Sequence, residues 1–332
     1  MSFDKKKPVA TETPFSGEHT AEGKIISISG GLYKIKLNEL DKNVFCRARG
    51  SFRHSGMTPL VGDNVTIRCA KAPAELSGDE AEGGIMIESV KERKNALIRP
   101  PMANLDCIFV TMAAASPAPI LTTVDKLVAI AEHNSIEPYI VVGKSELDPC
   151  KADEIKSIYS LSGFKTFSVS CVTGAGVGEL HEFISSELNG KTAAFSGASG
   201  VGKSTLMNML FPDLKLETGA ISRKIERGKH TTRSVDLYEV DNGGKSFYIA
   251  DTPGFSMLDF KQFDFFDKDA LPYTFREFDD YIGKCRYTKC THTKEEGCAI
   301  LEAIKEGKIA RSRHDSFLEL YEVLKNKKEW DK

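Results

Sequence analysis

The segment that most constrains this chain is AFSGASGVGKST at 194–205, a glycine-rich loop followed by a lysine and two hydroxyl residues. It follows the apolar run TAAFS and precedes the apolar run STLMNMLF, so we expect a strand before the loop and a helix after it. In that setting, backbone N–H groups turn towards phosphate oxygens, and the helix N-terminus adds a favourable dipole. The sequence therefore predicts a phosphate-binding loop in an α/β domain.

Two side chains of this loop have distinct expected roles. Lys203 would reach the β- and γ-phosphates of a nucleotide, and the Ser204 hydroxyl would coordinate Mg²⁺. The alternative is a glycine-rich turn that binds no ligand, which the flanking elements disfavour. The other expected nucleotide contacts in the loop are Gly197, Ala198, Ser199, Gly200, Val201, Gly202 and Thr205.

Two later motifs fit the same nucleotide. DTPG at 251–254 follows the apolar run SFYIA, so Asp251 could hold the Mg²⁺ shell and the Gly254 amide could contact the γ-phosphate. The segment RGKHTTR at 227–233 lies between the phosphate loop and DTPG. It offers Thr232, which we favour over Thr231, as a further Mg²⁺ ligand. Either segment alone could be an ordinary turn or polar loop. Behind a phosphate loop, the pair points to a GTPase.

The residue that would position the attacking water is unusual. Many GTPases place a glutamine directly after this glycine, whereas this chain has Phe255, which cannot form a hydrogen bond through its side chain. His230, in the preceding segment, is the nearest catalytic candidate in sequence. The alternative is a surface histidine with no part in catalysis.

The loops that would recognise the purine base precede the phosphate loop. YIVVGKSEL at 139–147 ends a buried strand where a loop of the form Asn-Lys-x-Asp would lie, and SVSCVTGAG at 168–176 ends the next strand. Strands can be joined in a new order without moving ligand groups, because the site forms at one sheet edge. We therefore predict a circular permutation, although two unrelated loops are an alternative. The expected base-binding residues are Gly143, Lys144, Ser145, Glu146, Ser170 and Cys171.

The surrounding pattern supports an α/β fold beside a smaller β domain. Buried strands alternate with helical patterns from about Asn104, which indicates a mostly parallel sheet with helices on its faces. Earlier, GKIISISGGLYKIKL reads as a hairpin, and several short strands follow it within a segment typical of a small β-barrel. The polar start, with its lysines and prolines, is expected to be a disordered tail.

A cysteine cluster near the C-terminus has the spacing of a metal site. Three thiolates and one imidazole form a closed tetrahedral set suited to a single structural Zn²⁺ ion, with no position left for a catalytic water. A redox pair or chance clustering is the alternative, and four ligands within a short segment make chance improbable. The expected zinc ligands are Cys285, Cys290, His292 and Cys298.

The charge balance limits the partners. The formal net charge of −2 excludes a generally basic nucleic-acid binder, so any RNA contact must come from a local patch. No apolar run approaches the ~20 residues of a membrane span, so we expect no membrane contact. The best candidate for RNA binding is a basic patch in which Phe45 and Phe52 alternate with basic residues. The alternative is that these residues form an ordinary solvent-exposed strand face. That patch is Arg47, Arg49, Arg53 and His54.

In combination, these features resemble the bacterial circularly permuted GTPases that depend on the small ribosomal subunit, the RsgA group. The resemblance covers about residues 22–320 and rests on CRARGSFR with VGDNV, IRPPMANLD, the motif order, GKHTTR, DTPGF and the cysteine cluster. It implies a tail (1–20), an OB-fold barrel (21–98), a permuted GTPase domain with motif order G4-G5-G1-G2-G3 (99–270) and a zinc-binding helical domain (271–332). It also implies a cytoplasmic monomer with catalytic His230, Thr232 and Lys203.

The resemblance implies a function as well as a fold. In that family, GTP hydrolysis is stimulated by the small (30S) ribosomal subunit and serves its late maturation. We expect GTP and GDP, Mg²⁺ and Zn²⁺ as ligands, and the small subunit with its rRNA as partner. Two alternatives remain: a nucleotide-gated RNA-binding module with negligible turnover, and a P-loop ATPase or kinase that acts on a small molecule.

This sequence departs from the family in the first base loop. Gly143 lacks the asparagine side chain that tethers the loop and contacts the purine, and Glu146 presents its carboxylate on a longer arm than aspartate. Because a lost hydrogen bond to a charged group costs about 1.5–3 kcal/mol, we expect affinity or guanine selectivity to fall by about tenfold or more.

Overall fold

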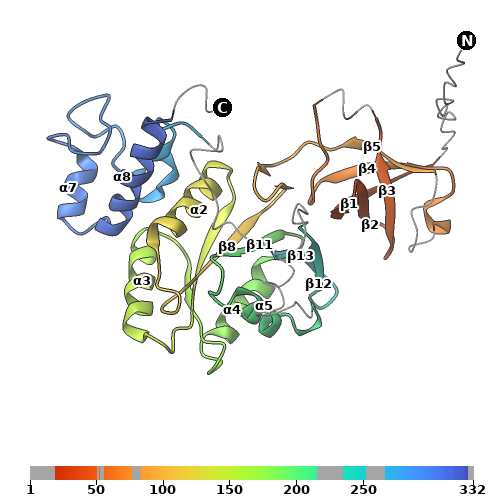
Figure 1. Ribbon diagram of the computed structural model, residues 1–332, viewed down its shortest axis with the longest axis horizontal. Coiled ribbons are helices and arrows are strands. Elements are labelled where there is room, and N and C mark those ends of the chain that lie inside the picture. Colours follow the sequence, from red (N-terminus) through yellow and green to blue (C-terminus); the bar gives the residue numbers. More distant parts are fainter. Residues whose placement is uncertain are drawn as a thin grey trace, which may run out of the picture. The chain divides into compact units, whose positions relative to one another are not determined.

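The computed structural model describes residues 19–50, 52, 56–76, 84–214, 235–251 and 266–327. They form two compact units, one from residues up to 59 with 63–92, the other from 60–62 and from 93 onward. The first unit is built from strands, and the second combines an α/β sheet with a helical C-terminal segment (Figure 1). In these described ranges, no helix has both the length and the apolar character that a membrane span requires.

The first unit is a closed barrel whose strand order is β1-β2-β3-β5-β4. Its strands alternate buried and partly exposed residues, which places one side of each strand in the barrel interior. The expected hairpin turn is present, because Gly30 and Gly31 both have positive φ between β1 and β2. The expected barrel is therefore confirmed. Its strands are β1 His19–Ser29, β2 Leu32–Leu37, β3 Asn43–Ala48, β4 Asn64–Cys69 and β5 Ile85–Val90.

The second unit contains a six-stranded sheet in the order β10-β9-β8-β11-β13-β12. All neighbouring strands are parallel except β12, which runs antiparallel to β13 at one edge. The mostly parallel sheet is thus confirmed. Its strands are β8 Cys107–Ala113, β9 Glu137–Gly143, β10 Thr166–Ser168, β11 Thr192–Gly197, β12 Leu237–Asp241 and β13 Ser246–Asp251, and a small ladder joins β6 Ala96–Leu97 to β7 Met102–Ala103.

Helices follow the parallel strands as the alternating pattern predicts. The helix α2 contacts β8 and β9, and α3 contacts β9 and β10. The helix α5 begins directly after the phosphate loop and contacts α4. The helices of this sheet are α2 Leu121–His133, α3 Pro149–Leu161, α4 Val177–Glu187 and α5 Lys203–Leu210.

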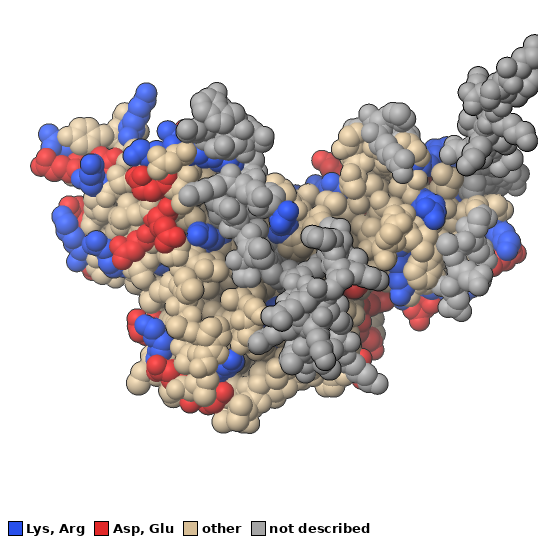
Figure 2. Space-filling model, viewed as in Figure 1, with Lys and Arg blue, Asp and Glu red and all other residues tan. Residues whose placement is uncertain are grey.

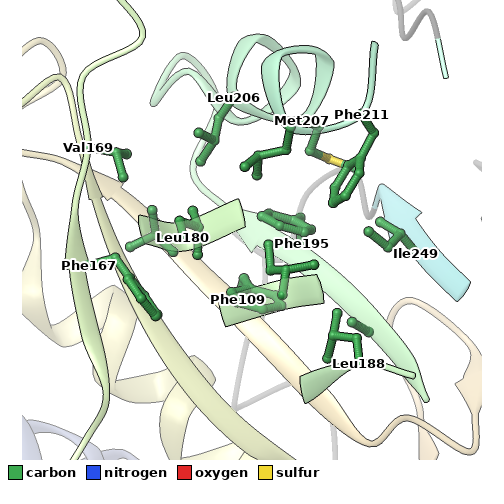
Figure 3. Packing of buried hydrophobic residues seen from close by; sticks show 14 of the residues in the cluster. Phe109, Phe167, Val169, Leu180, Leu188, Phe195, Leu206, Met207, Phe211 and Ile249 are labelled. Atoms are coloured by element: carbon green, nitrogen blue, oxygen red, sulfur yellow. The ribbon is translucent and has the colours of Figure 1, made fainter. Parts of the chain in front are cut away.

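Aromatic packing fixes the strand that carries the phosphate loop. The rings of Phe109 on β8 and Phe195 on β11 stack with their centroids 4.7 Å apart. Leu206 and Met207 from α5 lie over the same cluster (Figure 3). Since these side chains are buried, α5 and β11 are held at a fixed position on each side of the loop that joins them.

The C-terminal segment has little regular structure before its two helices. Two short 3₁₀ turns, η4 Leu271–Thr274 and η5 Arg276–Phe278, precede an irregular loop that contains the cysteine cluster. The helix α7 covers Ala299–Lys305, and α8 covers Arg311–Lys325. The helix α8 packs against α2, so this segment belongs to the same compact unit as the sheet. The final helix therefore packs on the nucleotide domain.

Candidate functional site

Four of the predicted ligand loops begin at the same edge of the sheet. The strands β9, β10, β11 and β13 are parallel, and they end at Gly143, Ser168, Gly197 and Asp251. The carboxyl ends of parallel strands form the ligand-binding edge of an open α/β sheet. The base loops and the phosphate loop therefore emerge side by side, although they are reversed along the chain.

The glycines of the phosphate loop have identifiable structural reasons. A Cβ at Gly197 would lie 2.2 Å from Thr111 O, so only glycine allows β11 to approach β8 this closely. Gly200 and Gly202 have φ of +82° and +97°, which side chains rarely adopt. These three positions set the backbone path that turns the loop into α5. The helix then begins at Lys203, with Ser204 and Thr205 in its first turn.

The phosphate loop and the DTPG motif meet through an ion pair. The Lys203 ammonium contacts Asp251 Oδ1, and the two side chains are only 12% and 24% exposed. The strands β11 and β13 are neighbours, with Phe195 paired to Asp251. The two groups expected to hold the phosphates and Mg²⁺ thus lie against each other at the end of the sheet.

The first base loop contacts the phosphate loop directly. Lys144 Nζ donates a hydrogen bond to Gly200 O at 2.8 Å and another to Ser116 O. The backbone N–H of Ser145 donates to Val169 O at 3.2 Å, which joins the two base loops. Lys144 therefore ties together three segments of the same edge. The sequence pattern gave no indication of Ser116, because its backbone oxygen has no residue-type signature.

The second base loop is organised by Ser170. Its buried hydroxyl accepts a hydrogen bond from Thr173 N at 3.1 Å, and its carbonyl accepts one from Gly174 N at 2.9 Å. Burial, together with the nearby Glu146 carboxylate, raises the pKa of the Cys171 thiol. Glu146 and Cys171 are therefore close to each other across the two loops. Within the described residues, no hydrogen-bond donor reaches the buried Glu146 Oε2.

Several predicted site residues fall outside the described residues. These are the three switch residues and two of the four residues in the RNA patch. The structure therefore carries no information on their positions. They are His230, Thr232, Gly254, Arg53 and His54.

The cysteine cluster has the dimensions of a zinc site. His292 Nδ1 lies 3.6 Å from Cys285 Sγ and 3.5 Å from Cys298 Sγ, and these two sulfurs are 3.9 Å apart. A tetrahedral zinc with ordinary Zn–S and Zn–N bonds places its ligand atoms about 3.5–3.8 Å apart. One ligand atom from each of these residues and from Cys290 lies within 4.8 Å of the others. The four residues therefore fit a structural zinc site in which the protein fills all four coordination positions.

Glu295 holds the loop between these ligands in place. Its carboxylate accepts hydrogen bonds from the backbone N–H groups of Thr291, Thr293 and Lys294, and from the Thr291 hydroxyl. Although partial burial alone would raise it, these hydrogen bonds lower the pKa of Glu295 to about 2. The loop thus has its own framework of charge-assisted hydrogen bonds, which the cysteine spacing did not reveal.

Two adjacent residues of α8 join the zinc loop to the nucleotide domain. His314 Nε2 lies 2.8 Å from His292 O, so it holds the backbone of a ligand residue. Arg313 Nη1 bonds Asp125 Oδ1 of α2 at 2.5 Å, and Arg313 Nε bonds Glu277 Oε1 at 2.7 Å. Sequence reasoning missed this buried network. The available signal was an Arg-His pair within the apolar pattern of the last helix.

The barrel presents part of the predicted RNA patch. Arg47 and Arg49 are exposed at the end of β3, and Arg49 Nη1 lies 3.6 Å from Glu88 Oε1. Lys and Arg are interspersed with Asp and Glu over the visible face of the molecule (Figure 2), in keeping with the small net charge. A contact with a polyanion must therefore be local rather than spread over a basic face.

Comparisons with known proteins agree with this site. A family model described as RsgA GTPase matches residues 90–261, and one described as RsgA N-terminal domain matches residues 22–74. A protein of Clostridium beijerinckii named small ribosomal subunit biogenesis GTPase RsgA is 39% identical over 92% of this chain and 99% of its own length. The protein of that name from Ruminiclostridium cellulolyticum is 37% identical over 92% of this chain and 94% of its own length.

Two solved structures are similar over nearly the whole chain. The crystal structure of YjeQ from Thermotoga maritima has a TM-score of 0.75 and 30% identity, and the match covers 93% of this chain and all of that one. The crystal structure of YloQ, described as a circularly permuted GTPase, has a TM-score of 0.70 and 30% identity, with 96% and 99% of the two chains covered. The permuted order predicted from the strand ends is therefore confirmed.

Proposed function

This chain belongs to the RsgA GTPase family, and on that basis we propose that it is a GTP hydrolase acting in late maturation of the small ribosomal subunit. The observation that carries the proposal is the hydrogen bond from Lys144 to Gly200, because it brings a base loop onto the phosphate loop. A single nucleotide can then contact both segments. The relatives' names do not favour the alternative of a binding module without turnover.

The phosphates of the nucleotide would be held by residues that contact each other in this structure. Lys203 would exchange its contact with Asp251 for phosphate oxygens, which leaves the carboxylate to join Ser204 and Thr232 around Mg²⁺. The chemistry that bound Mg²⁺ would supply is neutralisation of negative charge on the phosphoryl group. The chain's contribution is thus placement and charge stabilisation, with no covalent intermediate.

The guanine base of the nucleotide would be recognised mainly by Glu146. Guanine presents N–H donors at N1 and N2, and the buried Glu146 Oε2 is an acceptor that no described donor reaches. Lys144, held by Ser116 and Gly200, would support the loop beneath the base. Guanine is therefore the purine that best complements this loop, because adenine has no N–H donor at N1.

The remaining roles follow from the same proposal. Ordering of the segments around Thr232 and Gly254 by GTP would favour binding to the small subunit, and hydrolysis would release it. The barrel would contact rRNA through Arg47, Arg49, Arg53 and His54, and the protein would act as a cytoplasmic monomer. We retain the proposed division into residues 1–20, 21–98, 99–270 and 271–332.

His230 is the proposed positioning group for the attacking water, since Phe255 cannot take that part. We expect His230→Ala to lower the hydrolysis rate measured with purified small subunits by about a hundredfold or more, the range typical of proton-transfer and water-positioning groups. Phosphate release from GTP, with and without small subunits, measures this. His181→Ala, which changes a histidine on α4, is the matched control and should keep the wild-type rate.

Three outcomes, two from this assay and one from nucleotide-binding measurements, would change the proposal. An unchanged stimulated rate in His230→Ala would remove His230 from the mechanism but leave the GTPase assignment intact. Absence of stimulation by small subunits, with GTP binding retained, would favour the nucleotide-gated binding module. Equal affinity for ATP and GTP would instead favour a P-loop enzyme that acts on a small molecule.

Gly143→Asn is expected to tighten GTP binding by about tenfold, the value of one good hydrogen bond. A Cβ at this position would lie 3.4 Å from Val201 O and 3.6 Å from Met112 O, so a side chain fits without displacing either oxygen. An asparagine there would restore the tether and purine contact that the family pattern provides. Titration with a fluorescent GTP analogue checks this, and Gly143→Ala, which adds volume but no amide, is the control.

Two results of the affinity measurements would contradict the prediction for Gly143→Asn. Equal affinities of the wild-type, Asn and Ala proteins would show that the base loop needs no tether at this position. Tightening by both variants alike would assign the effect to backbone rigidity rather than to the amide.

A further inference from the structure

The barrel contains a cavity that the nucleotide site does not use. Its volume is about 410 Å³, and it opens between the β1–β2 turn, the β2–β3 face and residues 57–59. All its described lining residues belong to the barrel unit. A volume near the low end of the range for small-molecule sites is large enough for one nucleotide but too small for a folded element.

The inner wall of this cavity is aromatic and rigid. Phe52 lines the cavity and also packs against the buried barrel core, so one side of its side chain is fixed. Tyr33 lines it from β2 with only 9% of its surface exposed. Burial is also the main cause that raises the pKa of the Tyr33 hydroxyl. An aromatic surface held this way loses little freedom when a planar ligand stacks on it.

The mouth of the cavity is open because of two glycines. Gly30 and Gly31 lie on its rim, and a Cβ at either position would meet no atom within 4 Å. Both have positive φ, so other residues would be strained there. The turn therefore leaves backbone rather than side chains at the entrance, which permits close approach of a ligand.

The outer wall is cationic. Arg47 and Arg49 line the cavity on the exposed end of β3. Among the described residues, the Glu88 carboxylate lies 3.6 Å from Arg49 and also bonds Arg68, so two arginines share it. Within the described part of the barrel, Arg47 and Arg49 line the opening, Arg68 lies beside Arg49 through Glu88, and this excess of guanidinium groups favours an anionic ligand such as phosphate.

The described lining contains no acidic or carboxamide side chain, so contacts to a base edge could come only from the guanidinium and hydroxyl groups of its arginines, Tyr33 and Thr58. Among its ten residues, none is an Asp, Glu, Asn or Gln, in contrast to the Glu146 carboxylate of the GTP site. Stacking on the face of a base, which every base offers, would therefore contribute more to binding than contacts to its edge. Cationic side chains that meet the phosphates on either side of a stacked base fit a continuous strand better than a mononucleotide.

We propose that this cavity seats one unstacked base of single-stranded RNA, with its ring against Phe52 and its flanking phosphates against Arg47 and Arg49. The inference rests on the proposed contact between the barrel and RNA, and it specifies an unpaired strand rather than a duplex. OB-fold barrels use the same face, strands 2 and 3 with the first turn, for oligonucleotides. Selection among bases is weak, because every base can stack on an aromatic ring.

The test uses the full-length protein and fluorescently labelled RNA hexamers. Binding by anisotropy is compared for oligo(U), oligo(A) and a matched abasic hexamer that keeps only sugars and phosphates. Because stacking of one base on an aromatic side chain is typically a tenfold effect or more, Phe52→Ala should weaken both base-bearing hexamers by about tenfold. It should leave the abasic hexamer unchanged.

Two further variants separate stacking from charge and from folding. Phe52→Leu keeps apolar volume against the barrel core but removes the ring, so it should show the same selective loss in a folded barrel. Arg47→Gln should weaken all three hexamers and lower the slope of log affinity against log salt by about one. Tyr273→Ala, which changes an exposed ring in the other compact unit, should bind like wild type.

The outcomes distinguish this inference from the proposal beneath it. Equal binding of abasic and base-bearing hexamers by the wild-type protein would overturn the base pocket but leave the RNA contact. Failure to bind any hexamer would overturn both, while the GTPase assignment would still stand on the hydrolysis assay. Displacement of the hexamers by AMP at a comparable affinity would overturn the assignment to an RNA strand.

Discussion

Replacing Cys298 with Ser is expected to release the zinc ion and unfold the loop between Cys285 and α7. The apparent binding free energy of structural zinc is about 10–16 kcal/mol, and in a segment with few buried side chains it supplies most of the local folding free energy. The backbone of His292 supports this expectation, because its φ of +59° is unfavourable for a side chain and must be stabilised by its surroundings. Among the expected effects, this is the largest.

The measurement combines metal content with local protection. Zinc released by denaturation, measured with a chromophoric chelator, should fall from one equivalent to none, and hydrogen exchange should accelerate in 285–305. Nucleotide binding should persist, because the phosphate loop depends on the core around Phe109 and Phe195. Cys150→Ser, which changes an exposed thiol outside the cluster, is the control and should retain zinc. Full exchange protection in the zinc-free variant would contradict a structural metal.

Much of this fold and site could be predicted because local motifs carry strong geometry. The phosphate loop required a strand before it and a helix after it, and both are present as β11 and α5. The permutation could be inferred because ligand groups sit at strand ends, and strand ends are recognisable as buried runs that stop at polar residues. The cysteine spacing sufficed to predict that Cys285, Cys290, His292 and Cys298 gather in one cluster, since four side chains on one short segment need no tertiary information.

The features that escaped prediction depend on contacts between distant residues. The Lys144 bond to Ser116 needs a backbone oxygen, which every residue has. The cavity beside Phe52 arises from two glycines, one strand end and a separate loop, so no single segment contains its pattern. Arg313 could not be recognised as buried from the sequence, because charge normally marks the exposed face of a helix. The Arg313 side chain is buried because α2 and η5 pack against this side of the helix and supply its carboxylate partners.

Arg313 forms the principal electrostatic connection between the zinc-binding segment and the nucleotide domain. The side chains of Arg313 and Asp125 are each 1% exposed, and that of Glu277 is 3% exposed. Tyr159 of α3 also donates to Asp125 Oδ1, at 2.8 Å, and the Arg313 guanidinium lies 4.6 Å from the centroid of the Phe275 ring. Although burial alone would lower it, the two carboxylates raise the pKa of Arg313, so it remains charged.

We expect Arg313→Met to lower the free energy of unfolding of the nucleotide unit by about 3–5 kcal/mol, because it leaves two carboxylates buried without a cation. Urea denaturation followed by intrinsic fluorescence measures this, and Arg311→Met, which removes an exposed ion pair on the same helix, should change it by less than about 1 kcal/mol. The triple variant with Asp125→Leu and Glu277→Leu removes the unpaired charges too. It should recover most of the loss, since well-packed apolar residues can replace a buried ion network.

The comparison of these variants decides what the network is for. If the triple variant recovers stability but loses stimulation by small subunits, the ion network holds α8 and the zinc loop at the position that the activated GTPase requires. If it recovers both, the network contributes only to folding, and apolar packing between α2 and α8 suffices for the connection. A stable single variant would show that water reaches Asp125 and Glu277, contrary to their burial.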